Sequence, residues 1–266
     1  MNQIYVNIVL LFFLALSSLL FLRAKPGKDI VFSLSLGFAT LAAVVAAIMN
    51  NYPAWHTGFA ATIWASIAIT LVFFVLLVVI DKEAWRLSFL LSPYLFLLGL
   101  FALFGQSAPD RAIMGGDLPP SLFLHIIAAV LTYSLCTLAA LAALAAFIKE
   151  GALKKKKIGG MAGLFPAVSE SESLYIRLLF GGEIVLGLGL LSGILVRFLT
   201  YGDLLRFDHK TLLSILAFIV IAGILAAHHW VGIRGRLAAR VMLLGYLLLT
   251  LAYPGVKFVT GVLLGK

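Results

Sequence analysis

Five histidines are the side chains in this sequence best suited to binding a metal or moving a proton: His56, His125, His209, His228 and His229. A neutral imidazole is the commonest protein ligand for a transition metal, and its charge changes near physiological pH. Cys136 is the single cysteine, so neither a disulfide within the chain nor a cysteine-based metal site is possible. Chemistry at a metal would therefore depend on imidazoles.

Eight long apolar stretches must position these histidines. Hydrophobic residues make up 63% of the 266 residues, and charged residues only 12%. A helix that crosses a bilayer needs about 20 apolar residues, and continuous apolar runs exclude the alternating pattern of a barrel strand. We therefore expect an all-α, polytopic membrane bundle in a single domain, residues 1–266. Its spans are predicted near 4–22, 29–49, 58–80, 87–104, 121–148, 174–199, 211–229 and 238–262.

Positive charge is distributed unequally between the two sides of the predicted bundle. With the N-terminus outside, the inner loops carry fourteen of the twenty Lys and Arg residues, including the run Lys154 to Lys157. The positive-inside rule selects this orientation, with both termini outside. The lysine run is interpreted as a topology signal that also attracts anionic lipid. Nucleic-acid binding is not expected, because no basic DNA- or RNA-binding fold accompanies the lysine run.

Membrane depth sorts the histidines into two layers. His56, His125 and His209 lie near the predicted outer surface, whereas His228 and His229 lie near the inner one. Residues 209 and 228 on one helix would be about 28 Å apart, which is roughly one hydrocarbon thickness. A shared site must therefore combine residues of one layer.

His125 heads a stripe of small and polar residues on the fifth span. Ala129, Thr132 and Cys136 follow it at helical spacing, with Tyr133 beside them. This spacing predicts one face turned toward the bundle, with the imidazole at its outer end. The alternative is a histidine that serves only as a hydrogen-bonding group at the rim.

His209 belongs to the short polar sequence Asp208-His209-Lys210 before the seventh span. Asp208 would either cap that helix or orient an imidazole. Imidazoles from His125 and His209 on opposite faces of a macrocycle would give six-coordinate haem. Basic side chains near the same surface would meet the haem propionates; they are Arg206, Lys210 and Arg111.

Three local signals concern the packing of the later spans. Ser169 and Glu172 fit a capping box at the start of the sixth span. Gly189 and Gly193 form a GxxxG pair that predicts close helix packing. Pro254 is expected to kink the last span.

Several of these residues resemble the membrane proteins of cytochrome c assembly, which include the CcmC, CcsA and HemX groups. Leu124-His125 at the start of a span resembles their LHxx signature. Residues 201–210, YGDLLRFDHK, resemble the stretch WGxxWxWDPK, with Gly202, Asp208 and Lys210 identical. Downstream, His228-His229 and the segments 232–239 and 253–258 are similar to the family's HxR…GWRG…A…YFGVN ending. The resemblance covers residues 85–262 and is closest to the eight-span HemX/YpjD-type branch.

This resemblance implies a non-enzymatic protein that binds haem b and presents it at the outer face of the bacterial inner (plasma) membrane. His125 matches the family's first outer axial histidine, and His228 matches a histidine near the inner surface, for which His229 could substitute. The second outer histidine has no counterpart near the chain end, and we assign its role to His209. Expected partners are haem, membrane lipid and other proteins of the haem or cytochrome c assembly pathway.

Two other functions are compatible with the sequence. Glu183 is the one acid clearly inside a span, and it would either serve function or fix helix packing near Arg177. If Glu183, the histidines and the stripe of the fifth span lined a path, the protein would be a transporter or resistance factor for a cation or small metabolite. Alternatively, the protein would steady a membrane partner through the basic loop 150–170.

Overall fold

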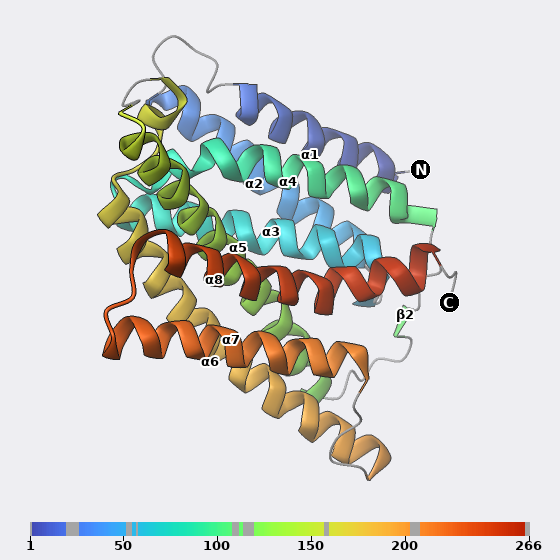
Figure 1. The fold of residues 1–266 in the computed structure, drawn as a ribbon. Helices are drawn as coiled ribbons and strands as arrows, with labels where there is room; N and C mark the ends of the chain where they lie inside the picture. Colours follow the sequence, from blue (N-terminus) through green and yellow to red (C-terminus); the bar gives the residue numbers. More distant parts are fainter. Residues whose placement is uncertain are drawn as a thin grey trace. The chain divides into compact units, whose positions relative to one another are not determined.

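The computed structural model describes residues 2–19, 27–51, 55–56, 58–107, 112–113, 120–156, 160–202 and 208–263. The described chain is almost wholly helical (Figure 1). It separates into two compact units. The first comprises Met1–Met114, Leu164–Pro166 and Phe258–Lys266, and the second Gly115–Gly163 and Ala167–Lys257.

The first unit is built from four helices, α1 (Asn2–Leu19), α2 (Ile30–Asn51), α3 (Phe59–Ile80) and α4 (Ser88–Phe104). Each packs against the next, and α1 also packs against α4, so the contacts form a closed ring. One antiparallel pair of two-residue strands, β1 (Trp55–His56) and β2 (Ala112–Ile113), joins its connections. Three short helical turns complete the unit: η2 (Ala84–Leu87), η3 (Gly105–Ser107) and η6 (Phe258–Leu263).

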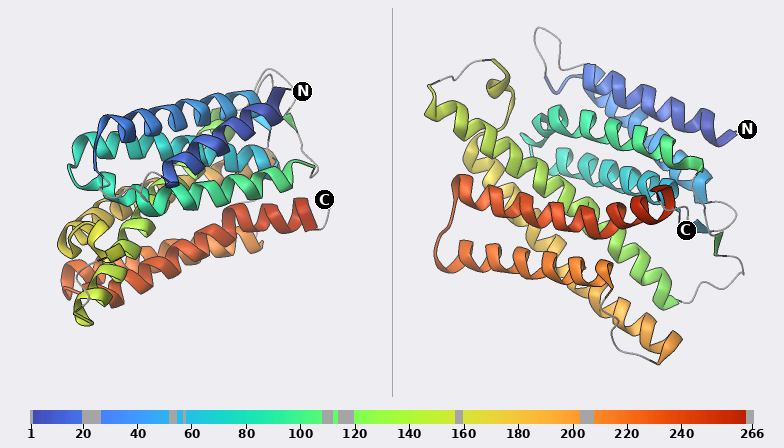
Figure 2. Two further views of the ribbon diagram at one scale, coloured as in Figure 1. Left: turned by 90° about the horizontal axis from the view of Figure 1, so that it is seen from above. Right: turned by 45° about the vertical axis from the view of Figure 1, so that its right-hand side comes forward.

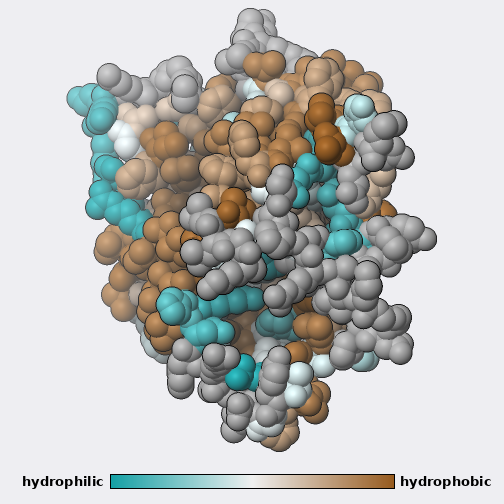
Figure 3. Space-filling view, turned by 90° about the vertical axis from the view of Figure 1, so that its right-hand side faces the viewer, coloured by the Kyte–Doolittle hydropathy of each residue, from teal (hydrophilic) through white to brown (hydrophobic). Residues whose placement is uncertain are grey.

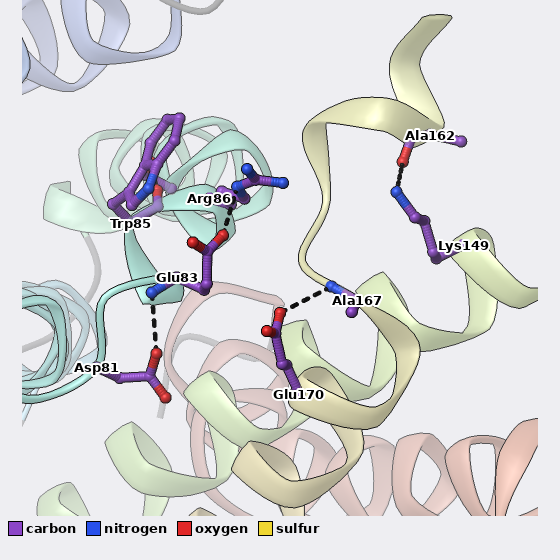
Figure 4. Close-up of polar contacts among 9 residues, drawn as sticks. Asp81, Glu83, Trp85, Arg86, Lys149, Ala162, Ala167 and Glu170 are labelled. Carbon is purple, nitrogen blue, oxygen red and sulfur yellow. Dashed lines mark hydrogen bonds and ion pairs between the residues drawn. The ribbon is translucent and has the colours of Figure 1, made fainter. Parts of the chain in front are cut away.

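Two pairs of polar side chains join helices inside the first unit. The hydroxyl groups of Ser17 and Ser35 lie 2.7 Å apart, and Asn50 Nδ2 donates to Asn7 Oδ1 at 3.0 Å. Such pairing is favourable because an apolar surrounding offers no water to replace a missing partner. The α3–α4 connection is held by the Arg86–Glu83 ion pair at 2.8 Å (Figure 4).

The second unit also contains four helices, α5 (Pro120–Lys154), α6 (Val168–Tyr201), α7 (His209–Trp230) and α8 (Gly235–Thr250), with the turn η4 (Gly160–Leu164). Its contacts form a ring as well, because α5 packs against both α6 and α8, and α7 against both α6 and α8. The α5–α6 pair makes the most extensive contact among the described elements. Figure 2 shows α7 and α8 running side by side.

Small residues explain how closely α5 approaches its neighbours. The C-terminal half of α5 buries Ala139, Ala142, Ala143 and Ala145 completely. A Cβ atom added to Gly182 of α6 would lie 3.0 Å from Cys136 Sγ. Since lipid removes the hydrophobic drive for helix association, such close backbone contact is what holds membrane helices together.

The outward faces of both units are apolar. Large side chains such as Phe104, Val79 and Leu191 are 80%, 77% and 65% exposed. Figure 3 shows hydrophilic side chains gathered in patches at one end, among hydrophobic ones. By length and composition, seven helices in the described ranges can cross a membrane, and α1 is a shorter apolar helix. The chain is therefore a multi-pass helical membrane protein, and all eight predicted spans are helices in its described part.

Two local predictions need correction or refinement. The predicted capping box is wrong, because α6 begins at Val168 and Glu170 Oε2 accepts the Ala167 N–H at 3.0 Å (Figure 4). Glu172 instead accepts a hydrogen bond from the Gly235 N–H at the start of α8. At Pro254, which has no N–H to donate, the last helix changes to π-helical geometry over η5 (Leu251–Gly255). Figure 4 also shows Lys149 Nζ donating to the Ala162 carbonyl at 2.8 Å.

Candidate functional site

Two adjoining cavities lie among the four helices of the second unit. The large cavity has a volume of about 360 Å³, and its wall includes His125, Gly193, Arg197 and Asp208. The small cavity has a volume of about 80 Å³ and is lined by side chains from α5 to α8 and η5. Both walls include His125, Gly189, Leu190, Lys210 and Ser214. His125 therefore stands where the two cavities meet.

The predicted stripe of α5 faces these cavities. His125, Ala129, Thr132 and Tyr133 all line the small cavity, and Cys136 is fully buried beyond them. Pro120 begins α5, a position that suits proline because the first helical N–H has no partner in the helix. The prediction that this face turns inward is confirmed.

The hydrogen bonds of His125 fix which ring nitrogen carries the proton. Nδ1 lies 3.0 Å from the Gly189 carbonyl and 3.2 Å from Ser192 Oγ, and Ser192 itself donates to the same carbonyl at 2.8 Å. A carbonyl only accepts, so Nδ1 of the neutral ring is the donor and Nε2 keeps its lone pair. A carbonyl partner on the other ring nitrogen is the usual arrangement around a metal-binding histidine.

Gly193 makes room for the imidazole ring. A Cβ atom at this position would lie 3.0 Å from His125 Cε1 and 3.3 Å from Nδ1, closer than side chains normally approach. One turn earlier, a Cβ on Gly189 would make an ordinary 3.5 Å contact with Ala128 Cβ. The GxxxG pair thus lets α5 approach α6 and lets the ring lie against the α6 backbone.

Charged side chains line one side of the large cavity. Arg197 of α6 and Lys210 of α7 line it together with Asp208. Gly202 ends α6 in the left-handed conformation (φ +76°), which favours glycine, and its N–H donates to the Phe198 carbonyl at 2.9 Å. Two cations and one acid give this wall a net positive charge, which suits a ligand with carboxylate groups.

Asp208 is the N-cap of α7. Its Oδ1 accepts the Thr211 N–H at 2.8 Å, so the carboxylate caps the start of the helix. Of the two roles predicted for this residue, the structure shows the capping one.

Replacing Asp208 with alanine is therefore expected to destabilise the protein by about 1 kcal/mol, the usual cost of losing an N-cap. Asp208→Asn, which retains a capping oxygen, should lose much less. Unfolding in mixed micelles with increasing denaturing detergent measures both variants. Equal losses in the two variants would show that the charge matters rather than the cap.

His209 is not brought to the wall of either cavity. It is exposed at the first position of α7, in phase with Leu212, Leu216 and Ile219, which are 57%, 44% and 59% exposed. Lys210 and Ser214, rotated by about 100° from that stripe, face the cavities instead. The assignment of His209 as a ligand stays a prediction.

His228 and His229 lie at the other end of α7. His228 is half-buried, and its Nδ1 lies 3.1 Å from the Ile233 carbonyl, whereas His229 is exposed. Neither lines a described cavity, and His56 belongs to the first unit. Arg206 and Arg111, both expected at the propionates, lie outside the described residues.

The structure adds residues that the sequence reasoning missed. Arg197 follows Gly189 and Gly193 at intervals of four, so helical phase alone would have placed it on the same face of α6. Ser214 stands in the same relation to Lys210. Tyr253 begins the segment 253–258 that resembles the family's ending, but helical phase does not assign it to the cavity, which it reaches from the π-helical turn η5.

The fold and the cavities define a multi-pass helical membrane protein in which His125 lies beside two cavities of the second unit. The chain belongs to the cytochrome C assembly protein family, whose sequence pattern matches residues 31–264. It is 49% identical over 245 residues to an Azospirillum brasilense protein described as an uncharacterised 28.8 kDa protein in the nifR3-like 5′ region. That match covers 91% of this chain and 90% of the relative. No solved structure matches the chain. Membership of this family is consistent with haem handling.

Proposed function

We propose that the protein binds haem b non-covalently, with His125 Nε2 as an axial ligand to the iron, and that haem is its cargo rather than a catalytic group. The observation that carries this proposal is the hydrogen bond from His125 Nδ1–H to the Gly189 carbonyl. It supports an imidazole whose free nitrogen is available beside a cavity of about 360 Å³. That volume falls within the usual range of about 300–1,000 Å³ for small-molecule sites.

The charges of the large cavity support the same ligand. Haem has two carboxylates on one edge and an apolar ring, and the cavity offers Arg197 and Lys210 beside Leu190 and Ile194. We assign the two basic side chains to the propionates and His125 to the iron. His125, Arg197 and Lys210 therefore fit haem, and this fit does not depend on a second ligand to the iron.

The Lys210→Gln substitution is expected to weaken haem binding about fivefold, since an exposed ion pair contributes about 1 kcal/mol at most. Haem dimethyl ester, which lacks both charges, should bind wild-type and variant proteins equally. Titrations followed by absorbance measure the four affinities. A variant that loses affinity for the ester to the same extent would place Lys210 away from the propionates.

The site is proposed to face outward from a bacterial inner membrane. The positive-inside distribution of Lys and Arg supports an orientation with both termini and the start of α5 outside. In this arrangement His228 and His229 lie toward the cytoplasm, where we propose a point of haem entry. His209 remains our candidate for the second axial ligand. In residues 201–210 the tryptophans of the family's WGxxWxWDPK stretch are replaced, which favours the HemX/YpjD-type branch. The proposed role is then storage, transfer or sensing of haem, together with partner proteins of the haem or cytochrome c assembly pathway.

A spectrum of the detergent-purified protein tests this function. Added haem should produce a saturable Soret band at one haem per chain, and the His56→Ala variant should match wild type because His56 lines neither cavity. A featureless titration, or a Soret change that never saturates, would refute haem binding.

A further inference from the structure

The small cavity contains a buried hydroxyl group that nothing in the described structure satisfies. Thr132 is 2% exposed and lines the cavity, and its Oγ1 has no hydrogen-bond partner there. Several other buried hydroxyl groups in these spans bond back to the carbonyl four residues earlier. Examples are Ser66 to Thr62, Thr70 to Ser66 and Thr137 to Tyr133. Thr132 makes no such bond, and it lies at a cavity wall.

The surroundings of Thr132 suit water. The cavity measures about 80 Å³, and one water molecule needs about 10–15 Å³ measured with a water-sized probe. A water molecule also needs two to four polar partners, and the same wall carries Ser214 and Lys210 as well as the tyrosines Tyr133 and Tyr253. An apolar cavity of this size stays dry, but this one has both the room and the hydrogen-bonding groups.

We propose that the small cavity is a water-binding pocket, in which ordered water molecules bond to Thr132 Oγ1 and connect it to the large cavity past Ser214 and Lys210. The residues shared by the two walls provide this continuity. Water would then reach at least one helical turn beyond His125 into the bundle. The inference does not require haem. If haem binds as proposed, the pocket brings solvent beside it, and solvent access is a main control of a metal's redox potential.

Radiolytic footprinting tests the pocket directly, because hydroxyl radicals made from bound water oxidise the aromatic rings beside them. Tyr133 lines the pocket and is 1% exposed, whereas Phe74 of α3 is 0% exposed and lines neither cavity. Each oxidation rate is divided by the rate of the same residue in the unfolded chain. After this correction, Tyr133 should be oxidised at least tenfold faster than Phe74. Equal rates would overturn the proposal.

The Thr132→Val substitution separates a wet pocket from a dry one. It keeps the shape of the side chain and removes the hydroxyl. In a hydrated pocket it should lower Tyr133 oxidation severalfold and also lower the thermal midpoint of unfolding. Thr137→Val is the comparison for the midpoint, because it removes a hydroxyl that is bonded to the Tyr133 carbonyl and to Tyr246 OH and should therefore lower the midpoint. In a dry pocket, removing an unsatisfied hydroxyl raises the midpoint. Undiminished oxidation of Tyr133, or a raised midpoint, would contradict the assignment of Thr132 as the water ligand.

Discussion

The His125→Ala variant is expected to bind haem at least about a hundredfold more weakly than wild-type protein. Loss of a partner around a metal ligand already costs about 10–100-fold in affinity, and loss of the ligand itself should cost more. In this chain the imidazole is held by two contacts to α6, from Nδ1 to the Gly189 carbonyl and to Ser192 Oγ. Its removal leaves no other histidine on the walls of the two described cavities.

Absorbance titration of purified His125→Ala measures this loss, and added imidazole should partly restore the Soret band by occupying the vacated space. His56→Ala is a suitable control, because His56 lines neither cavity and belongs to the first unit. An affinity within threefold of wild type would remove His125 from the iron.

The Gly193→Leu substitution is the second change with a large expected effect. A Cβ at this position already approaches His125 Cε1 to 3.0 Å, so the longer side chain must displace the ring and break its bond to Gly189. Haem affinity should fall about 10–100-fold, as for other losses of a group that orients a metal ligand.

Gly181→Leu on the same helix is the matched control for that substitution. A Cβ at Gly181 has no atom within 4 Å, so the added side chain enters open space. Both variants gain the same helix propensity, and only Gly193→Leu should lose haem affinity. If both variants kept wild-type affinity, the contact between α6 and the imidazole would have no part in binding.

The existence of the helices could be predicted because the apolar runs are long, but the residues at which the helices begin and end could not. The fifth span was predicted to end at 148, yet α5 continues to Lys154 with Lys149 and Glu150 inside it. The sixth begins at Val168 rather than near 174. Backbone hydrogen bonding extends a helix past the membrane into polar sequence, and hydropathy does not register this.

Helical phase decided how well the site was predicted. The stripe from His125 to Thr132 was found because its members share one face of α5. His209 and Lys210 are neighbours in sequence at the same membrane depth, but about 100° apart around α7. Membrane depth alone therefore predicted that His209 and His125 share a site, whereas the structure places Lys210 at the wall of the large cavity. The apolar residues Leu212, Leu216 and Ile219, in phase with His209, were the available signal of a lipid-facing stripe.

Contacts between helices could not be predicted from one sequence. The acceptor for His125 is a carbonyl on α6, 64 residues further along the chain, and no side-chain type identifies a carbonyl partner. Likewise, Tyr253 lines the small cavity from the segment around Pro254, where the last helix is π-helical. These features depend on which helices adjoin and on local backbone geometry.

The most direct test of the central claim is electron–nuclear double resonance of the ferric haem complex, prepared with ¹⁵N-labelled histidine. A coupling from an imidazole nitrogen to the iron, present in wild-type protein and changed or absent in His125→Ala, is the expected result. A spectrum of the haem complex with no histidine nitrogen on the iron, or with the same nitrogen coupling after His125 is removed, would contradict it.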